Sequence, residues 1–313
     1  MEKIAVLKFG GSSLSNSQKI ENAVIRSEKF LKSYSKILIV LSAPSNITDD
    51  LIKISSYFNP DNTTLEKLLT IGEQISIYLF EMALKKRKIK AISLNHYQLK
   101  IKIDKNKEIK SLDLKLIKKN FKYFDIIIFP GFIGIDKDQN PLTLARGGSD
   151  YTAVYLANKL KADCYLLSDI KGVYSSNPSK IENAKKLDEI TYTEILEISK
   201  FDSQIRQNKA MEYAAKKNLQ IFLGSTFENS KMTLITSKKN KNSKIRYIFI
   251  NSTQNTTDIT LIAENIYKRK DLKEKIEKLN PLSYFVNENS IIIHFPKLNT
   301  NEIKKIYFKF ILK

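Results

Sequence analysis

Short apolar runs alternate with amphipathic stretches along most of the chain. The runs are nearly continuous in apolar residues, as in strands buried on both faces, and lie at residues 4–10, 36–43, 90–95, 125–134, 163–170 and 219–225. Between them, apolar positions recur every three or four residues, which predicts helices over 17–32 and 65–86 and others beginning near 149 and 193. Buried strands separated by helices predict an α/β fold, a three-layer αβα sandwich with a mostly parallel central sheet.

Two segments depart from this alternation. Residues 95–110 are more polar and alternate in character, which predicts a hairpin on the edge of the sheet. The run SKKNKNSK at 237–244 is rich in lysine and asparagine and is the best candidate for a linker. Two strands, a helix, another strand and a final helix from Asn301 are predicted beyond it. We therefore expect a large domain over 1–236 and a small C-terminal α+β unit over 237–313.

The composition is that of a soluble globular protein. Of the 313 residues, 42% are hydrophobic and 27% charged, and no apolar run approaches the roughly 20 residues of a membrane span. The first strand pattern begins at Ile4, which leaves no room for a signal peptide. A single cysteine, Cys164, excludes an internal disulfide framework. We expect a cytoplasmic protein without a membrane partner.

The net charge of +20 raises the question of nucleic-acid binding. Six of the 53 basic residues are arginine and the other 47 are lysine, spread over the whole chain. Local clusters occur at 85–90 and 237–244, but no zinc finger, helix-turn-helix or aromatic-laced RNA motif accompanies them. We therefore interpret the lysines as solvated surface and expect no nucleic-acid partner.

The stretch LARGGSDYTAVYLANKL at 144–160 places an arginine and an aspartate at the mouth of a helix. From Tyr151 onward, apolar residues recur with helical spacing, so Ser149 or Asp150 is the expected N-cap. The first turn of a helix attracts anions, and the planar fork of Arg146 suits a carboxylate or phosphate. Asp150 would repel an anion unless it caps the helix or acts through a cation. A tight turn with an ordinary cap explains this stretch equally well.

Other clusters of glycine, hydroxyl groups and charge follow the predicted strands. In VLKFGGSS, two glycines can expose backbone N–H groups to oxyanions and Lys8 adds a mobile positive charge, although the spacing is not that of a Walker A loop. The loop SAPSNIT at 42–48 is rich in hydroxyl groups, and TIGEQ places Glu73 within a helical pattern. In LLSDIKGVYSSNP, Asp169 suits a ribose hydroxyl or an adenine amino group. Singly, each residue also fits a surface charge or a turn.

Taken together, these motifs resemble the aspartokinases of the amino-acid-kinase superfamily. KFGGSS, GE, GFIG, RGGSDYTA and SDIKGVY occur in the family's order between Lys3 and about Thr236. The resemblance implies a catalytic domain over 1–236 that transfers the γ-phosphoryl group of MgATP to the side-chain carboxylate of L-aspartate. The product is 4-phospho-L-aspartate, which leads toward lysine, threonine and methionine. It also implies ATP and Mg²⁺ as cofactors, with no direct protein ligand of the metal identified.

The resemblance assigns roles residue by residue. Lys8 would stabilise the transferring phosphoryl group with the amides of Gly10 and Gly11, and Asp150 would hold Lys8 through an ion pair. Arg146 would bind a carboxylate of the substrate bidentately, and Glu73 would bind its ammonium group. The implied catalytic residues are Lys8 and Asp150; the substrate-binding residues are Ser42, Thr48, Glu73, Arg146, Gly147, Gly148 and Ser149; the nucleotide-binding residues are Lys8, Phe9, Gly10, Gly11, Ser168, Asp169 and Tyr174.

The chain departs from the family pattern near the nucleotide. Ser179 stands where the family usually has arginine, and Gln204 where it usually has lysine; Lys180, Arg206 or Lys209 would have to compensate. Each lost charge-assisted contact weakens binding by roughly 1.5 to 3 kcal/mol. A catalytically weak or inactive homologue with a binding or assembly role is therefore the alternative. A superfamily member acting on glutamate, acetylglutamate or a nucleoside monophosphate is a third reading.

The C-terminal region is also short for the family. Aspartokinases typically end in two ACT modules that bind feedback amino acids, whereas residues 237–313 have room for one at most. The strand, helix, strand order there is compatible with a single degenerate module, acting either as a dimerisation unit or as an effector site. The resemblance favours a homodimer.

Overall fold

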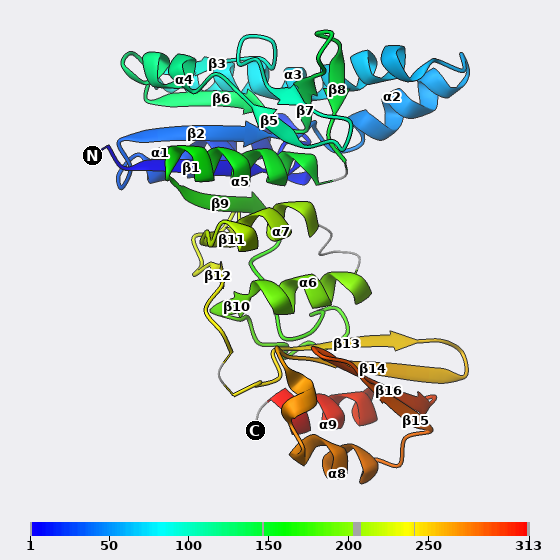
Figure 1. The fold of residues 1–313 in the computed structure, drawn as a ribbon. Helices are drawn as coiled ribbons and strands as arrows, with labels where there is room; N and C mark the ends of the chain where they lie inside the picture. Colours follow the sequence, from blue (N-terminus) through cyan, green and yellow to red (C-terminus); the bar gives the residue numbers. More distant parts are fainter. Residues whose placement is uncertain (1, 146, 203–207, 241, 312–313) are drawn as a thin grey trace. The chain divides into compact units, whose positions relative to one another are not determined.

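The computed structural model describes residues 2–145, 147–202, 208–240 and 242–311 (Figure 1). Contacts divide the chain into two compact units. The first unit contains Met1–Lys171 and Glu212–Met232, and the second contains Gly172–Met211 and Thr233–Lys313. Each unit is described by itself.

A parallel sheet forms the centre of the first unit. Its strands follow the order β11, β9, β1, β2, β6, β3, and neighbouring strands pair in parallel. Their bounds are β1 Ile4–Phe9, β2 Lys36–Leu41, β3 Ala91–Ser93, β6 Ile126–Pro130, β9 Asp163–Ser168 and β11 Ile221–Ser225. The buried strands predicted from the apolar runs are confirmed, as is the mostly parallel sheet.

Helices cover both faces of this sheet. Alternate residues of β1 and β2, such as Leu7 and Ile39, pack in one apolar cluster with Val24 of α1 and Phe80 of α3. The opposite face packs against α5, which lies in front of β1 and β9 in Figure 1. The helices of this part are α1 Ser17–Phe30, α2 Ile47–Ser56, α3 Asn62–Lys86, α4 Leu114–Phe121 and α5 Gly148–Leu160, with the 3₁₀ turn Gly11–Ser13. Helix α7, Asn208–Lys216, begins in the second unit and continues into the first from Glu212. The layers are those of the predicted αβα sandwich.

A second, smaller sheet corrects one prediction. The hairpin expected within 95–110 exists as β4 Lys102–Ile103 and β5 Ile109–Ser111, but it does not border the parallel sheet. It joins β7 Ile133–Ile135 and β8 Pro141–Thr143 in a separate four-stranded sheet. The reason is a break in the predicted strand 125–134: Phe132 has φ of +67°, which ends β6 and redirects the chain into β7.

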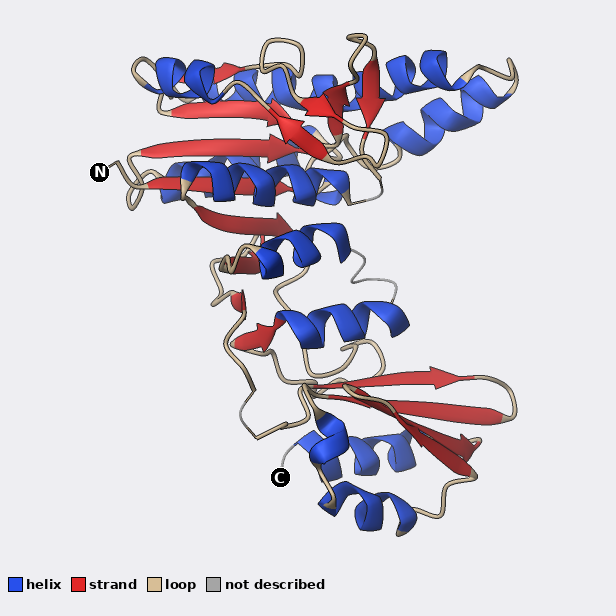
Figure 2. Ribbon diagram, in the orientation of Figure 1, coloured by secondary structure: helices blue, strands red, loops and turns tan. Residues whose placement is uncertain are grey.

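The second unit contains an antiparallel sheet. Its order is β13, β14, β16, β15, and α8 and α9 lie on one side of it (Figures 1 and 2). The bounds are β13 Tyr247–Ser252, β14 Thr256–Ile262, β15 Ser283–Val286, β16 Ser290–Pro296, η2 Ile266–Lys268, α8 Asp271–Glu277 and α9 Thr300–Ile311. Isoleucines of β14 and β16 pack against Tyr307 of α9 in one core. The predicted C-terminal α+β elements are confirmed, and β15 was not predicted.

The second unit also holds the parallel pair β10 Glu189–Thr191 and β12 Thr233–Thr236. Helix α6, Tyr192–Phe201, begins with a capping box in which Thr191 and Glu194 each accept from the other's backbone N–H. No helix in the described ranges is long and apolar enough to span a membrane.

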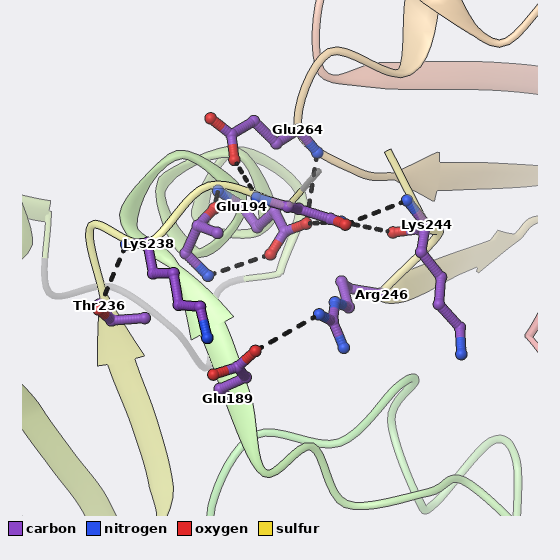
Figure 3. Close-up of polar contacts among 9 residues, drawn as sticks. Glu189, Glu194, Thr236, Lys238, Lys244, Arg246 and Glu264 are labelled. Atoms are coloured by element: carbon purple, nitrogen blue, oxygen red, sulfur yellow. Dashed lines mark hydrogen bonds and ion pairs between the residues drawn. The ribbon is translucent and has the colours of Figure 1, made fainter. Parts of the chain in front are cut away.

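The lysine-rich run at 237–244 forms neither helix nor strand in its described residues, as expected of a connection, but it is firmly anchored. The backbone N–H of Asn240 donates to Glu264 Oε2 at 2.9 Å, and its side-chain amide donates to Glu194 Oε1 at 2.7 Å. Both glutamates are buried, and Figure 3 shows them beside Lys238, Lys244 and the Glu189–Arg246 pair. One asparagine therefore fixes this segment to two buried carboxylates.

Candidate active site

A pocket of about 510 Å³ opens at the carboxyl ends of β1 and β2 in the first unit. Because parallel strands end at the same edge of a sheet, side chains that follow different strands meet there. Its lining comes from five separate stretches of the sequence and consists of Lys8, Gly11, Ser42, Ala43, Thr48, Asp49, Ile52, Glu73, Phe132, Gly147, Gly148, Ser149 and Asp150. The structure thus brings together most of the substrate-side residues that the sequence indicated.

Lys8 and Asp150 form the predicted ion pair. Lys8 lies near the end of β1 and Asp150 in the first turn of α5, and Nζ is 2.9 Å from Oδ1. Both residues are more than 90% buried. A buried cation needs a partner because burial removes its hydration, and the carboxylate also fixes the position of the ammonium group. The pair explains why an aspartate lies beside an anion-binding helix end.

Glu73 is a buried carboxylate in the wall of the pocket. Its Oε1 accepts a hydrogen bond from the backbone N–H of Ala43 at 3.3 Å, whereas Oε2 has no partner among the described residues. Burial raises the pKa of Glu73 to about 7, although the bond from Ala43 partly opposes this. The preceding residue makes the position possible: a Cβ on Gly72 would lie 2.9 Å from the Ala43 Cβ, so only glycine lets α3 approach this loop.

The start of α5 corrects the predicted N-cap. Neither Ser149 nor Asp150 caps the helix; the N-cap is Gly147, with φ of +82° and no side-chain capping bond. Glycine adopts this left-handed conformation without a steric penalty, so the helix begins two or three residues earlier than predicted. Asp150 lies inside the first turn, where its carboxylate reaches Lys8. Arg146, the proposed carboxylate clamp, lies outside the described residues.

The loop after β1 is tied to the end of β9. Ser12 Oγ donates to Asp169 Oδ1 at 3.1 Å, which brings the predicted nucleotide residue Asp169 beside the KFGGSS loop. The amide of Gly10 donates to Leu167 O at 3.1 Å, so it extends the sheet and is not available to phosphate as the sequence suggested. Ser168 lies at the end of β9, where its carbonyl accepts from the Thr226 N–H. Phe9 is fully buried in the core.

Two predicted nucleotide features belong to the second unit. Tyr174 forms an isolated antiparallel bridge with Lys186. Lys180, a candidate replacement for the missing arginine, donates instead to Ile250 O and lies 5.5 Å from the centre of the Phe249 ring. Ser179 Oγ donates to Asn177 Oδ1 at 2.8 Å. Gln204 and Arg206 lie outside the described residues, and Lys209 lies in α7.

Sequence reasoning missed four lining residues, Ala43, Asp49, Ile52 and Phe132. Asp49 follows the predicted Thr48 and stands in the first turn of α2, a helix that was not predicted. Phe132 lies within the quoted motif GFIG, and its positive φ is uncommon for an aromatic residue. Backbone strain of this kind is not visible in a residue pattern. Within the described ranges, no group of three or more His, Cys, Asp or Glu is placed to hold a metal.

Comparison with known proteins agrees with this arrangement. The model of the Amino acid kinase family matches residues 3–225. The chain is 36% identical over 241 residues to an aspartate kinase of Pseudomonas fluorescens, covering 74% of this chain and 58% of that protein. It thus spans little more than half the length of such relatives.

Solved structures show the same fold. An aspartate kinase from Synechocystis aligns with a TM-score of 0.69 at 25% identity, over 97% of this chain and 55% of that one. Aspartokinase III of E. coli, in complex with aspartate and ADP, aligns with a TM-score of 0.67 at 21% identity, over 95% of this chain and 79% of that one. Since the family model covers well over half of the residues, the chain belongs to the amino acid kinase family.

Proposed function

We propose that this protein is an aspartokinase, which transfers the γ-phosphoryl group of MgATP to the side-chain carboxylate of L-aspartate and yields 4-phospho-L-aspartate. The observation that carries the proposal is one pocket that combines the buried Lys8–Asp150 pair with the buried, unpartnered carboxylate oxygen of Glu73. Relatives named aspartate kinases and a neighbour containing aspartate and ADP support it. The product places the enzyme in amino-acid biosynthesis toward lysine and threonine.

The charges of the pocket residues indicate how L-aspartate would bind. L-Aspartate carries two carboxylates and one ammonium group. Glu73 presents the negative charge in the pocket that suits the ammonium, and the hydroxyl groups of Ser42 and Thr48 suit a carboxylate. The amino end of α5, where Ser149 lies, favours a second carboxylate through its partial positive charge, and Arg146 precedes it in the chain. Opposite charges at separate places would orient the substrate.

Phosphoryl transfer requires charge neutralisation and alignment of two oxygens more than covalent chemistry by the protein. Bound MgATP supplies the phosphoryl group and the metal's positive charge. Lys8 places its ammonium group at the pocket wall, and the ion pair with Asp150 fixes the position of that group. The carboxylate of Asp169, held by Ser12, suits a ribose hydroxyl or an adenine amino group. These residues fit a nucleotide, and Mg²⁺ is expected to stay mostly on phosphate and water.

We further propose a homodimer acting in the cytoplasm, with catalysis in 1–236 and the remaining residues as a small accessory unit. The four-stranded antiparallel sheet supports this division because its strands lie wholly within 247–296. The inactive-homologue alternative receives less support, since Lys8, Asp150 and Glu73 keep the arrangement that the chemistry needs.

The test is ATP turnover by the purified chain with L-aspartate and Mg²⁺, trapping the acyl phosphate with hydroxylamine. Aspartate-dependent hydroxamate is expected, with little from glutamate or acetylglutamate. Lys8→Met is the matched control for contaminating kinases, because it preserves side-chain length and removes the charge. A folded wild-type protein that forms no aspartate-dependent hydroxamate at saturating ATP would refute the proposal. Preference for glutamate would reassign the substrate.

A further inference from the structure

Ser76 is a buried serine of α3 whose hydroxyl group bonds outside its own helix. The residue is 1% exposed, and its Oγ donates to the carbonyl oxygen of Ser42 at 2.7 Å. Serines within helices commonly donate to a carbonyl one turn earlier in the same helix, as Ser27 of α1 does to Ala23 O at 2.9 Å. The hydroxyl group of Ser76 instead serves the loop that follows β2.

Glu73 holds the same peptide group from the other side. The carbonyl of Ser42 and the N–H of Ala43 belong to one planar trans peptide group, in which they point in opposite directions. The N–H of Ala43 donates to Glu73 Oε1 at 3.3 Å. Glu73 and Ser76 are neighbours on α3 because they are three positions apart. We call these two side chains and the Ser42–Ala43 peptide group the peptide clamp, since one turn of α3 binds both polar atoms of the peptide.

The peptide clamp belongs to the wall of the candidate active site. Three of its members, Ser42, Ala43 and Glu73, line the pocket of about 510 Å³, whereas Ser76 is not among the described lining residues. Because Ser76 is buried and bonded to the Ser42 carbonyl, an effect of its hydroxyl group on a bound ligand must pass through the Ser42–Ala43 peptide group.

The clamp determines how the carboxylate of Glu73 is bonded. Oε1 accepts from Ala43, and Oε2 is buried without a partner among the described residues. A peptide group rotates as a unit about the single bonds on either side of it, and such a rotation would withdraw the Ala43 N–H from Glu73. While Ser76 holds the opposite end, the rotation has to break two hydrogen bonds instead of one. The serine hydroxyl group thus stabilises the bond between Ala43 and Glu73.

We propose that Ser76 is a positioning residue of the substrate site: its hydroxyl group holds the Ser42–Ala43 peptide, which in turn keeps the carboxylate of Glu73 in the orientation and charge state that bind the ammonium group of L-aspartate. This inference rests on the function proposed above, in which Glu73 binds that ammonium group. Ser76 acts on the affinity for aspartate, because Lys8 and Asp150 are held by their own ion pair.

Removal of the hydroxyl group is expected to change the pH dependence of aspartate binding. Burial raises the pKa of Glu73 to about 7, and the Ala43 N–H opposes part of this rise by stabilising the carboxylate. The other charged groups described in the pocket are Lys8 of β1, Asp49 of α2 and Asp150 of α5, and the variant leaves all three in place. Without the Ala43 bond, the pKa of Glu73 should rise by about one further unit.

The test is calorimetric titration of L-aspartate into the full chain between pH 6 and pH 9. Ser76→Ala is expected to move the pH of half-maximal affinity upward by about one unit, which weakens binding about fivefold at pH 7 and leaves it close to that of the wild type at pH 9. Ser76→Cys keeps almost the same size and offers a weaker donor, so it should move the midpoint less, and it carries the test if the alanine variant does not fold. Ser27→Ala removes a buried hydroxyl group that bonds within α1, and it should leave the midpoint unchanged.

A double-mutant cycle separates positioning from a loss of structure. In a Glu73→Gln background the titrating group is gone, so adding Ser76→Ala should weaken aspartate binding by less than about twofold. A loss of affinity that is equal at every pH and in both backgrounds would overturn the role of Ser76, because it would reflect a general distortion of the pocket. An unchanged midpoint in Ser76→Ala would overturn that role as well, while the hydroxamate assay still decides the kinase proposal. A wild type that binds no aspartate would overturn both proposals.

Discussion

Replacing Glu73 with glutamine tests the substrate site through its pH dependence. The change keeps the size of the side chain and removes the ionisable group. Burial raises the pKa of Glu73 to about 7 from an ordinary value of 4.5. The carboxylate form, which the substrate ammonium requires, is therefore a minority below pH 7 and dominates above it.

The magnitude follows from the fraction ionised. With a pKa near 7, roughly a tenth of Glu73 is ionised at pH 6 and roughly nine tenths at pH 8. Apparent affinity scales with the fraction in the competent form, so aspartate should bind about tenfold more tightly at pH 8 than at pH 6. Glu73→Gln should lose this pH dependence and, at pH 8, about 1.5 to 3 kcal/mol of binding free energy, which is roughly 10- to 150-fold in affinity.

The assay is calorimetric titration of aspartate into the protein at pH 6, 7 and 8. Among the described residues, the other charged groups that line the pocket are Lys8, Asp49 and Asp150, so Asp49→Asn serves as the control for a change of negative charge elsewhere on the wall. It should keep the slope with pH. A wild-type affinity that is flat from pH 6 to 8, or a Glu73→Gln protein with an unchanged slope, would refute the assignment.

The raised pKa of Glu73 gives the free energy of unfolding a pH dependence opposite to that of aspartate affinity. Because the folded state holds this proton more tightly than the unfolded state, the group favours folding most below pH 4.5, and stability is lost as pH rises to about 7. The shift corresponds to about 3 kcal/mol at pH 8.5. Glu73→Gln should therefore raise the melting temperature at pH 8.5 more than at pH 5. If Glu73→Gln changes the melting temperature equally at pH 5 and pH 8.5, the carboxylate of Glu73 is solvated in the folded protein.

Three further predictions concern other charged and polar groups. Lys8→Met and Asp150→Asn should each reduce kcat at least about 100-fold in the hydroxamate assay while circular dichroism stays unchanged. Asn240→Ala removes the side-chain hydrogen bond to the buried Glu194, while the backbone bond to Glu264 remains, and should destabilise the second unit by about 1 to 3 kcal/mol in thermal unfolding, whereas exposed Asn255→Ala should not. Lys180→Ala should leave KM for ATP within about twofold, since its ammonium is engaged by a carbonyl; a tenfold rise would show that it compensates for the missing arginine.

The parallel sheet could be predicted because its signal is local. Strands such as β1 and β2 are buried on both faces, so they appear as continuous apolar runs whatever their neighbours are. The helix α2 was missed although Ile47, Leu51 and Ile54 recur at i, i+4 and i+7. It has only ten residues, of which only Ser55 is buried, and Ile54 is 64% exposed, so its short apolar pattern does not mark a core element.

The site was partly predictable for a topological reason. Once a sheet is parallel, clusters that follow its strands converge at one edge, and Lys8, Thr48 and Asp150 were found in this way. The direction in which the chain leaves a strand was harder to predict from the sequence. The turn at Phe132, which moves the hairpin to a separate sheet, depends on one strained backbone angle that the residue type disfavours.

The helix cap shows how function can displace a local preference. Aspartate and serine are good N-caps, and the pattern at 149–150 predicted one of them. In the structure glycine takes that position, which leaves the carboxylate of Asp150 free to pair with a lysine 142 positions earlier in the chain, at 2.9 Å. A capping bond would satisfy one backbone N–H, whereas the ion pair keeps a buried cation charged and in place. The larger electrostatic requirement prevails, and it can be seen only when both ends of the pair are brought together by the fold.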